Sequence, residues 1–268
     1  SDSCSLQSQS IQESESESES ETNYAPVQGI WNPRYFDWGG DMKACTINCR
    51  SIKNKLGGLG AFIESMEIPI ISLTETWEVA EEKESIKSLK ELANATKMTY
   101  YGRPRKTRGG GVALLISAAL FQSNGIQRKT RGDVEIVSAR LKAKSPRFPN
   151  PIVAMSVYIP PKIVGSVHEE DTMEEICQQV QSELHKNPTT RFLIMGDMNH
   201  ADMTELLEVD KMKQVVNKPT RGDNILDLII TNMTSTELEI LNPISEDLTA
   251  SDHRIPVITI KPEEKNDM

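Results

Sequence analysis

The sequence has few cysteines, no long apolar run and no excess of positive charge, and each shortage excludes a class of protein. Four cysteines in 268 residues are too few and too scattered for a disulfide framework. No apolar stretch reaches the roughly 18 residues that suggest a membrane span, and no signal-peptide pattern opens the chain. With 39 acidic and 30 basic residues, the chain is not a globally basic protein that coats nucleic acid. We therefore expect a soluble intracellular protein with no membrane partner.

Two local patterns that suggest bound groups are also incomplete. Cys45 and Cys49 lie at an even separation along one predicted strand, so they face the same side, but no histidine or second cysteine pair is near them. This argues against a zinc site and for buried free thiols. The three glycines at 109–111 do not belong to a Gly-x-x-x-x-Gly-Lys pattern, so a nucleotide-binding P-loop is rejected.

The acidic charge is concentrated at the beginning of the chain. The formal net charge is −9, but residues 1–30 hold six acids and no lysine or arginine, which leaves −3 for the rest. The six are Asp2, Glu13, Glu15, Glu17, Glu19 and Glu21. This Ser/Glu-rich segment has too little apolar surface to offset its ordering entropy, so we expect it to be disordered. It could be a solubilising linker or a casein-kinase-type phosphorylation target, and the linker is favoured. The aromatic residues of 31–40 suggest an arm that docks on the body. Because the chain begins with Ser1, we expect a piece of a longer protein or a processed chain.

The periodicity of the remaining residues predicts one domain over 41–262, followed by a polar tail at 263–268. Apolar runs predict strands at 42–48, 68–73, 110–117, 134–141, 152–158, 192–195, 226–231 and 257–260. Helical spacing predicts helices at 54–66, 81–95 and 168–185. Strands outnumber helices, and not every pair of strands has a helix between them. This favours two packed mixed β-sheets with helices outside over a doubly wound single sheet.

Acidic side chains come at the ends of several of these strands. They are Glu75 in Thr-Glu-Thr-Trp (74–77), Asp197 in Gly-Asp-Met-Asn (196–199), Asp227 in Leu-Asp-Leu (226–228) and Asp252 in Ser-Asp-His (251–253). Strand ends that bring carboxylates to one edge of a sheet would build a site for a hard cation. Hydrolysis of a phosphodiester needs a metal, a base and neutralisation of charge on phosphorus.

Each segment also has an ordinary structural explanation when it is taken alone. A lone glutamate often opens a helix, Asn48 could cap a turn, and Gly-Asp-Met-Asn favours a β-turn. Asp227 is different, because it lies inside an apolar run where burying a carboxylate is costly without a partner. His253 is a partner that would offset this cost, since a carboxylate on one ring nitrogen selects the tautomer and favours the charged ring.

Taken in chain order, the motifs resemble the endonuclease/exonuclease/phosphatase superfamily. They are Ile47-Asn48, Thr-Glu-Thr-Trp at 74–77, Arg-Gly-Gly-Gly-Val-Ala at 108–113, Val-Tyr-Ile-Pro-Pro at 157–161, Gly-Asp-Met-Asn at 196–199, Thr-Arg at 220–221 with Leu-Asp-Leu at 226–228, and Ser-Asp-His at 251–253. More narrowly, 48–55, 74–77 and the glycine run resemble the apurinic-endonuclease-like domain of non-LTR (LINE-type) retrotransposons. The resemblance covers about 42–262, and Met198 stands where the family usually has an aromatic residue.

This resemblance implies a fold, an activity and its partners. The fold would be an α/β four-layer sandwich of two mixed β-sheets flanked by helices, of the DNase I type. The activity would be Mg²⁺-dependent nicking of double-stranded target DNA in the nucleus, with Mn²⁺ as a possible substitute ion. The nick would leave a 3′-hydroxyl that a reverse transcriptase, encoded beyond Met268 in the parent polyprotein, extends during transposition.

The resemblance also implies a role for each site residue. Glu75 would be the main metal ligand, with Asn48 and Asp252 completing the metal site. Asp197 would position or deprotonate the attacking water with help from Asn199, Tyr158 would hold the scissile phosphate, and His253 paired with Asp227 would stabilise the transition state. The residues expected to contact DNA are Arg50, Asn54, Lys55, Arg108, Thr220 and Arg221.

Two other functions compete with this one. The chain could be another enzyme of the superfamily, such as a sphingomyelinase, an inositol-phosphate phosphatase or an RNA deadenylase. It could also be a non-catalytic module that binds nucleic acid or protein and derives from such a domain.

Overall fold

The computed structural model describes residues 40–78, 83–105, 109–131, 133–244 and 251–263. The expected acidic linker and docking arm, almost all of the polar C-terminal tail and Arg108 lie outside the described residues. Within them, no helix is both long enough and apolar enough to cross a membrane.

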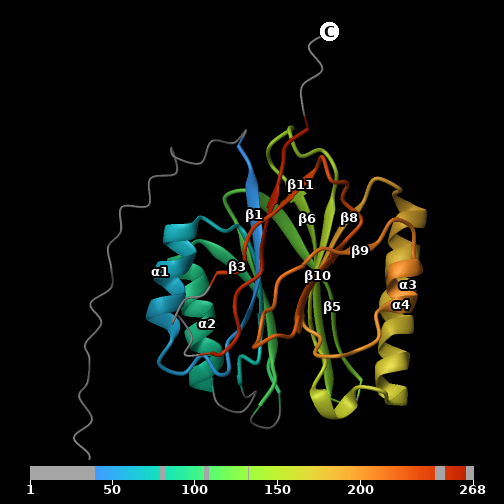
Figure 1. Ribbon diagram of the computed structural model, residues 1–268. Helices are drawn as coiled ribbons and strands as arrows, with labels where there is room; N and C mark the ends of the chain where they lie inside the picture. Colours follow the sequence, from blue (N-terminus) through green and yellow to red (C-terminus); the bar gives the residue numbers. More distant parts are fainter. Residues whose placement is uncertain (1–39, 79–82, 106–108, 132, 245–250, 264–268) are drawn as a thin grey trace, which may run out of the picture. The chain divides into compact units, whose positions relative to one another are not determined.

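Two six-stranded sheets form the centre of the domain (Figure 1). The first has the order β11-β12-β1-β2-β4-β3, and the second has the order β5-β6-β7-β8-β10-β9. The first sheet contains β1 (Met42–Asn48), β2 (Ile70–Thr74), β3 (Met98–Arg103), β4 (Val112–Ser117), β11 (Leu238–Ile240) and β12 (Val257–Ile260). The second contains β5 (Phe121–Arg131), β6 (Val134–Ala143), β7 (Ile152–Tyr158), β8 (Arg191–Asp197), β9 (Lys213–Gln214) and β10 (Asp227–Thr231). Both sheets are mixed, because β1–β2 and β7–β8 are parallel pairs whereas the other pairs are antiparallel.

Helices cover the outer face of each sheet, which makes four layers (Figure 1). The helices are α1 (Leu56–Met66), α2 (Lys83–Ala95), α3 (Val167–Lys186) and α4 (Thr204–Glu208), with a short 3₁₀ turn, η1 (Pro161–Ile163). Neighbouring residues of a strand face opposite layers: Ala44 packs between the sheets, whereas Cys45 packs under α1 and α2. Central strands are therefore buried on both faces, which explains why they are largely apolar. The predicted four-layer fold is confirmed.

The differences from the expected elements lie mainly at sheet edges and helix ends. Strands β3 and β5 were not predicted, and both are edge strands of their sheets. An edge strand has one unpaired side and tolerates polar residues, so the strong apolar signal of a central strand is missing. Helix α1 begins at Leu56 and not at Asn54, because Asn54 has a left-handed backbone with φ of 61°. The three described cysteines, Cys45, Cys49 and Cys177, are buried free thiols, as predicted.

One glycine sets the approach of two central strands next to the site. Gly196 has φ of +150°, and a Cβ there would lie 1.8 Å from the backbone oxygen of Val157 on β7. We expect Gly196→Ala to lower the free energy of unfolding by about 3 kcal/mol in urea titrations, since β8 would have to shift. Gly165→Ala is the matched control, because Gly165 also has positive φ but nothing within 4 Å of the added Cβ. It should cost only about 1 kcal/mol; equal losses would mean that the close approach is unimportant.

Candidate active site at the edge shared by the two sheets

The polar strand ends predicted from the sequence meet at one edge of the domain. In the second sheet, Asp197 at the end of β8 pairs with Tyr158 on one side and Asp227 on the other. In the first sheet, Asn48 ends β1, and Glu75 directly follows β2. Two hydrogen bonds join the sheets here: Asn48 Nδ2 donates to Asp197 Oδ2 at 2.8 Å, and the Tyr158 hydroxyl donates to Glu75 Oε1 at 3.1 Å. The site therefore needs both sheets.

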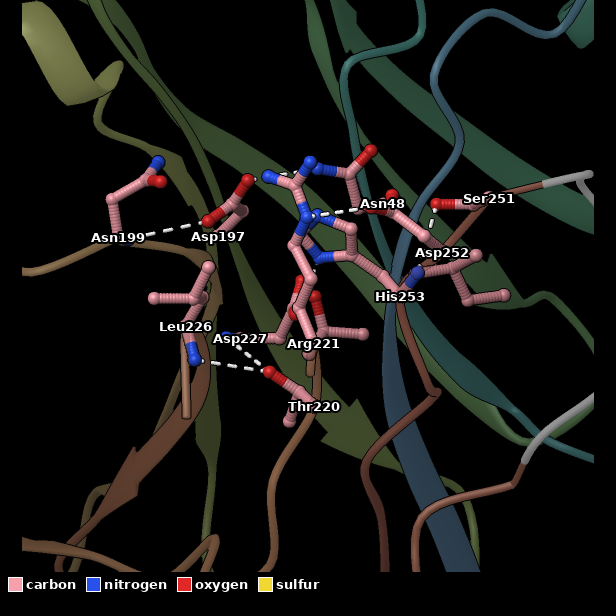
Figure 2. Close-up of polar contacts among 12 residues, drawn as sticks. Asn48, Asp197, Asn199, Thr220, Arg221, Leu226, Asp227, Ser251, Asp252 and His253 are labelled. Carbon is pink, nitrogen blue, oxygen red and sulfur yellow. Dashed lines mark hydrogen bonds and ion pairs between the residues drawn. The ribbon is translucent and has the colours of Figure 1, made fainter. Parts of the chain in front are cut away.

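Asp197 is held from two directions in a buried position (Figure 2). Besides the amide of Asn48, the backbone NH of Asn199 donates to Asp197 Oδ1 at 3.2 Å. The side chain of Asn199 is itself fixed, because its Nδ2 donates to the backbone oxygen of Ile159 at 2.7 Å. Burial, followed by the nearby Asp227 carboxylate, raises the pKa of Asp197 to about 7. A carboxylate with a pKa near neutrality is suited to accepting a proton at physiological pH.

Asp227 and His253 form the buried pair expected from the sequence (Figure 2). His253 Nδ1 lies 2.7 Å from Asp227 Oδ2. The hydroxyl of Thr220 accepts hydrogen bonds from the backbone NH groups of Leu226 and Asp227, at 2.9 and 3.1 Å, and so fixes the start of β10. Burial opposes the charged ring of His253, but the hydrogen bond and charge of Asp227 outweigh it and raise the pKa of His253. The ring nitrogen Nε2 is then the one that can meet a substrate.

The donor atoms of this region suit a divalent metal. One ligand atom each from Asp197, Asp227 and His253 lies within 4.8 Å of the others. Among the described residues, Asp227 Oδ1 is buried with no hydrogen-bond partner, which suits it to be a metal ligand. Burial and then the carboxylates of Glu75 and Asp197 raise the pKa of Tyr158, so Glu75 is close to the same centre. Carboxylate oxygens are the ligands that Mg²⁺ prefers.

Two expected metal ligands are placed differently. Both oxygens of Asp252 pair with arginines. Oδ1 pairs with Arg50 at 2.8 Å, and Oδ2 pairs with Arg221 at 2.7 Å (Figure 2). Burial alone would raise the pKa of Asp252, but the hydrogen bond and charge of Arg221 outweigh it and lower the pKa. Asn48 uses its amide to hold Asp197, and its Oδ1 accepts the backbone NH of Arg50 at 3.1 Å. Neither placement supports direct metal ligation; Asp252 holds two arginines at the rim, and Asn48 orients Asp197.

The residues expected to contact DNA divide into two groups. Arg50 and Arg221 are about half exposed at the rim, and Asn54 is also exposed. Lys55 instead braces its own loop, with Nζ donating to the backbone oxygens of Cys49 and Arg50 at 2.8 and 3.1 Å. Thr220 is fully buried, with its hydroxyl accepting backbone NH groups. The position of Thr220 does not support a DNA contact by its side chain, because a buried hydroxyl cannot reach a phosphate.

Two buried acids near the site were missed in the sequence. Glu78 and Glu135 are fully buried, and burial is the main reason that the pKa of each rises to about 7. The Tyr100 hydroxyl donates to Glu78 Oε2 at 2.7 Å. Glu135 lies within the apolar run of β6, the same signal of a partnered carboxylate that identified Asp227.

The layers and the site edge together define an α/β sandwich of the DNase I type. The chain belongs to the Endonuclease/Exonuclease/phosphatase family, whose pattern it matches over residues 45–253. Members of this family are hydrolases that act on phosphodiester bonds and typically depend on a divalent metal. A comparison with curated protein sequences found no match.

Solved structures show the same fold at low sequence identity. Truncated Caenorhabditis elegans TDP2 is 12% identical, with a TM-score of 0.60 over 82% of this chain and 98% of that one. The human Nocturnin catalytic domain is 13% identical, with a TM-score of 0.58 over 83% and 94%. ANGEL2, a 2′,3′-cyclic phosphatase, is 10% identical, with a TM-score of 0.61 over 83% and 96%.

Proposed function

We propose that this protein is a divalent-metal-dependent DNA endonuclease that nicks double-stranded target DNA by phosphodiester hydrolysis. The observation that carries the proposal is the meeting of Glu75, Asp197 and the Asp227–His253 pair at one edge, with two half-exposed arginines beside them. This arrangement combines a proton acceptor, a cationic group and oxygen ligands for a metal. Those are the components that phosphodiester hydrolysis needs.

The residues of the chain divide the chemistry between them. Asp197, with its pKa near neutrality, accepts a proton from the attacking water, and Asn48 and Asn199 hold its two oxygens in place. His253, whose charged form is favoured by Asp227, donates toward the phosphate oxygens as negative charge develops there. The Tyr158 hydroxyl, which donates to Glu75, would hold the scissile phosphate.

Glu75 and the Asp197–Asp227 pair are the carboxylates that would hold Mg²⁺ or Mn²⁺. A bound divalent ion there would act as a Lewis acid that neutralises charge on the phosphate.

DNA binding is assigned to the rim. Arg50 and Arg221 each keep a large exposed fraction while Asp252 orients them. Arginines that contact phosphates give affinity that does not depend on sequence and weakens with salt. The narrower assignment to a retrotransposon, with a 3′-hydroxyl that primes a reverse transcriptase, is supported by the motifs at 48–55 and 74–77 and stays a proposal.

Nicking of a supercoiled plasmid tests the function. We expect conversion to open circles with Mg²⁺, no conversion with a chelator, and nicks that a DNA polymerase extends directly because they end in a 3′-hydroxyl. Salt should inhibit steeply, as for any protein that releases counterions from DNA.

Two results would contradict the proposal. Metal-dependent release of phosphate from small phosphate esters or 2′,3′-cyclic phosphates, without plasmid nicking, would identify another enzyme of the family. Binding of DNA without cleavage at any metal concentration would identify a non-catalytic module.

A further inference from the structure

We propose that Glu135 and Arg105 are positioning residues for Glu75. They clamp the glycine loop, defined as residues 109–111, and this loop holds the turn that carries Glu75. The effect on catalysis rests on the proposed function, because it assumes that Glu75 binds the metal. The clamp itself is a structural claim that can be tested without any activity.

The first part of the clamp is a buried ion pair at the glycine loop. Glu135, on β6 of the second sheet, accepts the backbone NH of Gly111 on Oε2 at 2.5 Å. Its Oε1 lies 3.0 Å from Arg105 Nε. Arg105 also donates through Nη1 to the backbone oxygen of Gly109 at 3.2 Å. The loop is therefore held through both a backbone NH and a backbone oxygen.

The second part connects the loop to Glu75. The backbone NH of Thr76 donates to Gly111 O at 3.2 Å, and that of Trp77 donates to Gly110 O at 2.7 Å. Glu75 and Trp77 both have left-handed backbones, with φ of 48° and 56°. Non-glycine residues keep such conformations only where the surroundings enforce them. The glycine loop supplies this restraint immediately after the expected metal ligand.

The close contact also explains why glycines stand here. Gly110 and Gly111 have φ of +69° and +90°. A Cβ on Gly111 would lie 2.3 Å from Thr76 Oγ1, and one on Gly110 would lie 2.9 Å from Glu135 Oε2. The loop is thus pressed between the Glu75 turn on one side and the Glu135 carboxylate on the other, with no room for a side chain.

Arg105 is also connected to the segment that carries Tyr158, the hydrogen-bond partner of Glu75. Arg105 Nη2 pairs with Asp133 at 2.5 Å. Asp133 also pairs with Lys162, which lies just beyond the prolines that come after Tyr158. Glu135 is the direct cross-strand neighbour of Tyr158. One network therefore contacts the segments that carry both partners of the hydrogen bond between the sheets.

Amide hydrogen exchange tests the clamp directly. Glu135→Leu removes the acceptor for Gly111, so exchange at the amides of Thr76 and Trp77 should become about tenfold faster. Glu135→Gln keeps an acceptor oxygen and should restore most of the protection. Glu183→Leu is the matched control, because Glu183 is a buried acid on α3 that pairs with Arg140 of β6, the strand that carries Glu135. It should leave both amides unchanged.

Calorimetric titration with Mn²⁺, in the absence of DNA, tests the consequence for Glu75. The Mn²⁺ dissociation constant should rise about tenfold in Glu135→Leu and stay near the wild-type value in Glu135→Gln and Glu183→Leu. In the plasmid assay, the metal concentration for half-maximal nicking should rise by the same factor, with a smaller change in the rate at saturating metal.

The outcomes separate this proposal from the proposed function. Unchanged exchange at Thr76 and Trp77, or faster exchange with unchanged Mn²⁺ affinity, overturns the positioning role. A wild-type protein that binds Mn²⁺ but cleaves no DNA contradicts the endonuclease and leaves the positioning result valid. If Glu135→Leu does not fold, Gly111→Ala is used instead, and it should give the same two changes because its Cβ displaces Thr76.

Discussion

Replacing His253 by alanine is expected to slow plasmid nicking about 10³-fold at saturating Mg²⁺. The ring is buried, and its Nδ1 is held 2.7 Å from Asp227 Oδ2, so one tautomer and one orientation are selected. The carboxylate raises the pKa of the ring and so favours its charged form, and that charge is needed mainly when negative charge develops on the phosphate. Affinity for uncleaved DNA, measured with Ca²⁺ in place of Mg²⁺, should stay within about twofold, because it depends mainly on phosphate contacts.

Two controls separate this catalytic role from a folding role. The alanine variant leaves Asp227 buried without its partner, which is destabilising, so the double variant Asp227→Asn/His253→Ala should recover part of the lost thermal stability but none of the activity. His185→Ala removes an exposed histidine at the end of α3 and should change neither property. Equal losses of DNA binding and cleavage in His253→Ala would show that the residue acts only in folding.

Asp197→Asn is expected to lower nicking by about 10²–10⁴-fold and at the same time to stabilise the metal-free protein above neutral pH. The activity falls because an amide cannot accept the proton of the attacking water. The stability rises because the native carboxyl is buried beside Asp227, which raises its pKa from the ordinary 3.8 to about 7. Groups needed for activity often lower the stability of a protein, so replacing one of them can raise the free energy of unfolding.

The pH dependence of this stabilisation has a definite sign. Below about pH 4, Asp197 is protonated in both the native and unfolded states and contributes no difference. Between pH 4 and 7 the unfolded chain ionises while the native carboxyl keeps its proton, so the free energy of unfolding falls as pH rises. Above about pH 7 the carboxyl is ionised in both states, and the loss in the free energy of unfolding reaches its full value. We therefore expect Asp197→Asn to gain about 4 kcal/mol at pH 8, from a shift of about three pKa units, and nothing at pH 4.

Thermal unfolding in the presence of a chelator measures this difference, since a bound cation would lower the pKa of Asp197. In the wild-type protein with bound metal, nicking should fall about tenfold for each pH unit below the lowered pKa of Asp197, as the base becomes protonated. Asp210→Asn, at an exposed carboxylate, is the control and should leave both stability and rate unchanged. An Asp197→Asn variant that keeps a tenth of the activity would exclude Asp197 as the base.

The sequence predicted the central strands of the two sheets better than the edge strands. Central strands such as β1 and β7 are buried on both faces, so their apolar runs predicted both their positions and the two-sheet fold. Edge strand β5 carries polar residues and has no such pattern, and it was missed. Asp227 could be predicted to have a partner, because a carboxylate in an apolar run is costly without one.

By itself, then, the sequence determined the fold class, the family and the residues that meet at the site, since these follow from local apolar patterns and short motifs. Only the tertiary structure decided what each residue contacts. Asn48 holds Asp197, and Asp252 pairs with Arg50 and Arg221. Thr220 is buried, and its hydroxyl accepts a hydrogen bond from the first residue of β10. The reason is physical: a side chain's partner depends on strand register and on the spacing between sheets. These arise from contacts between segments that are distant in the chain, which no local pattern records.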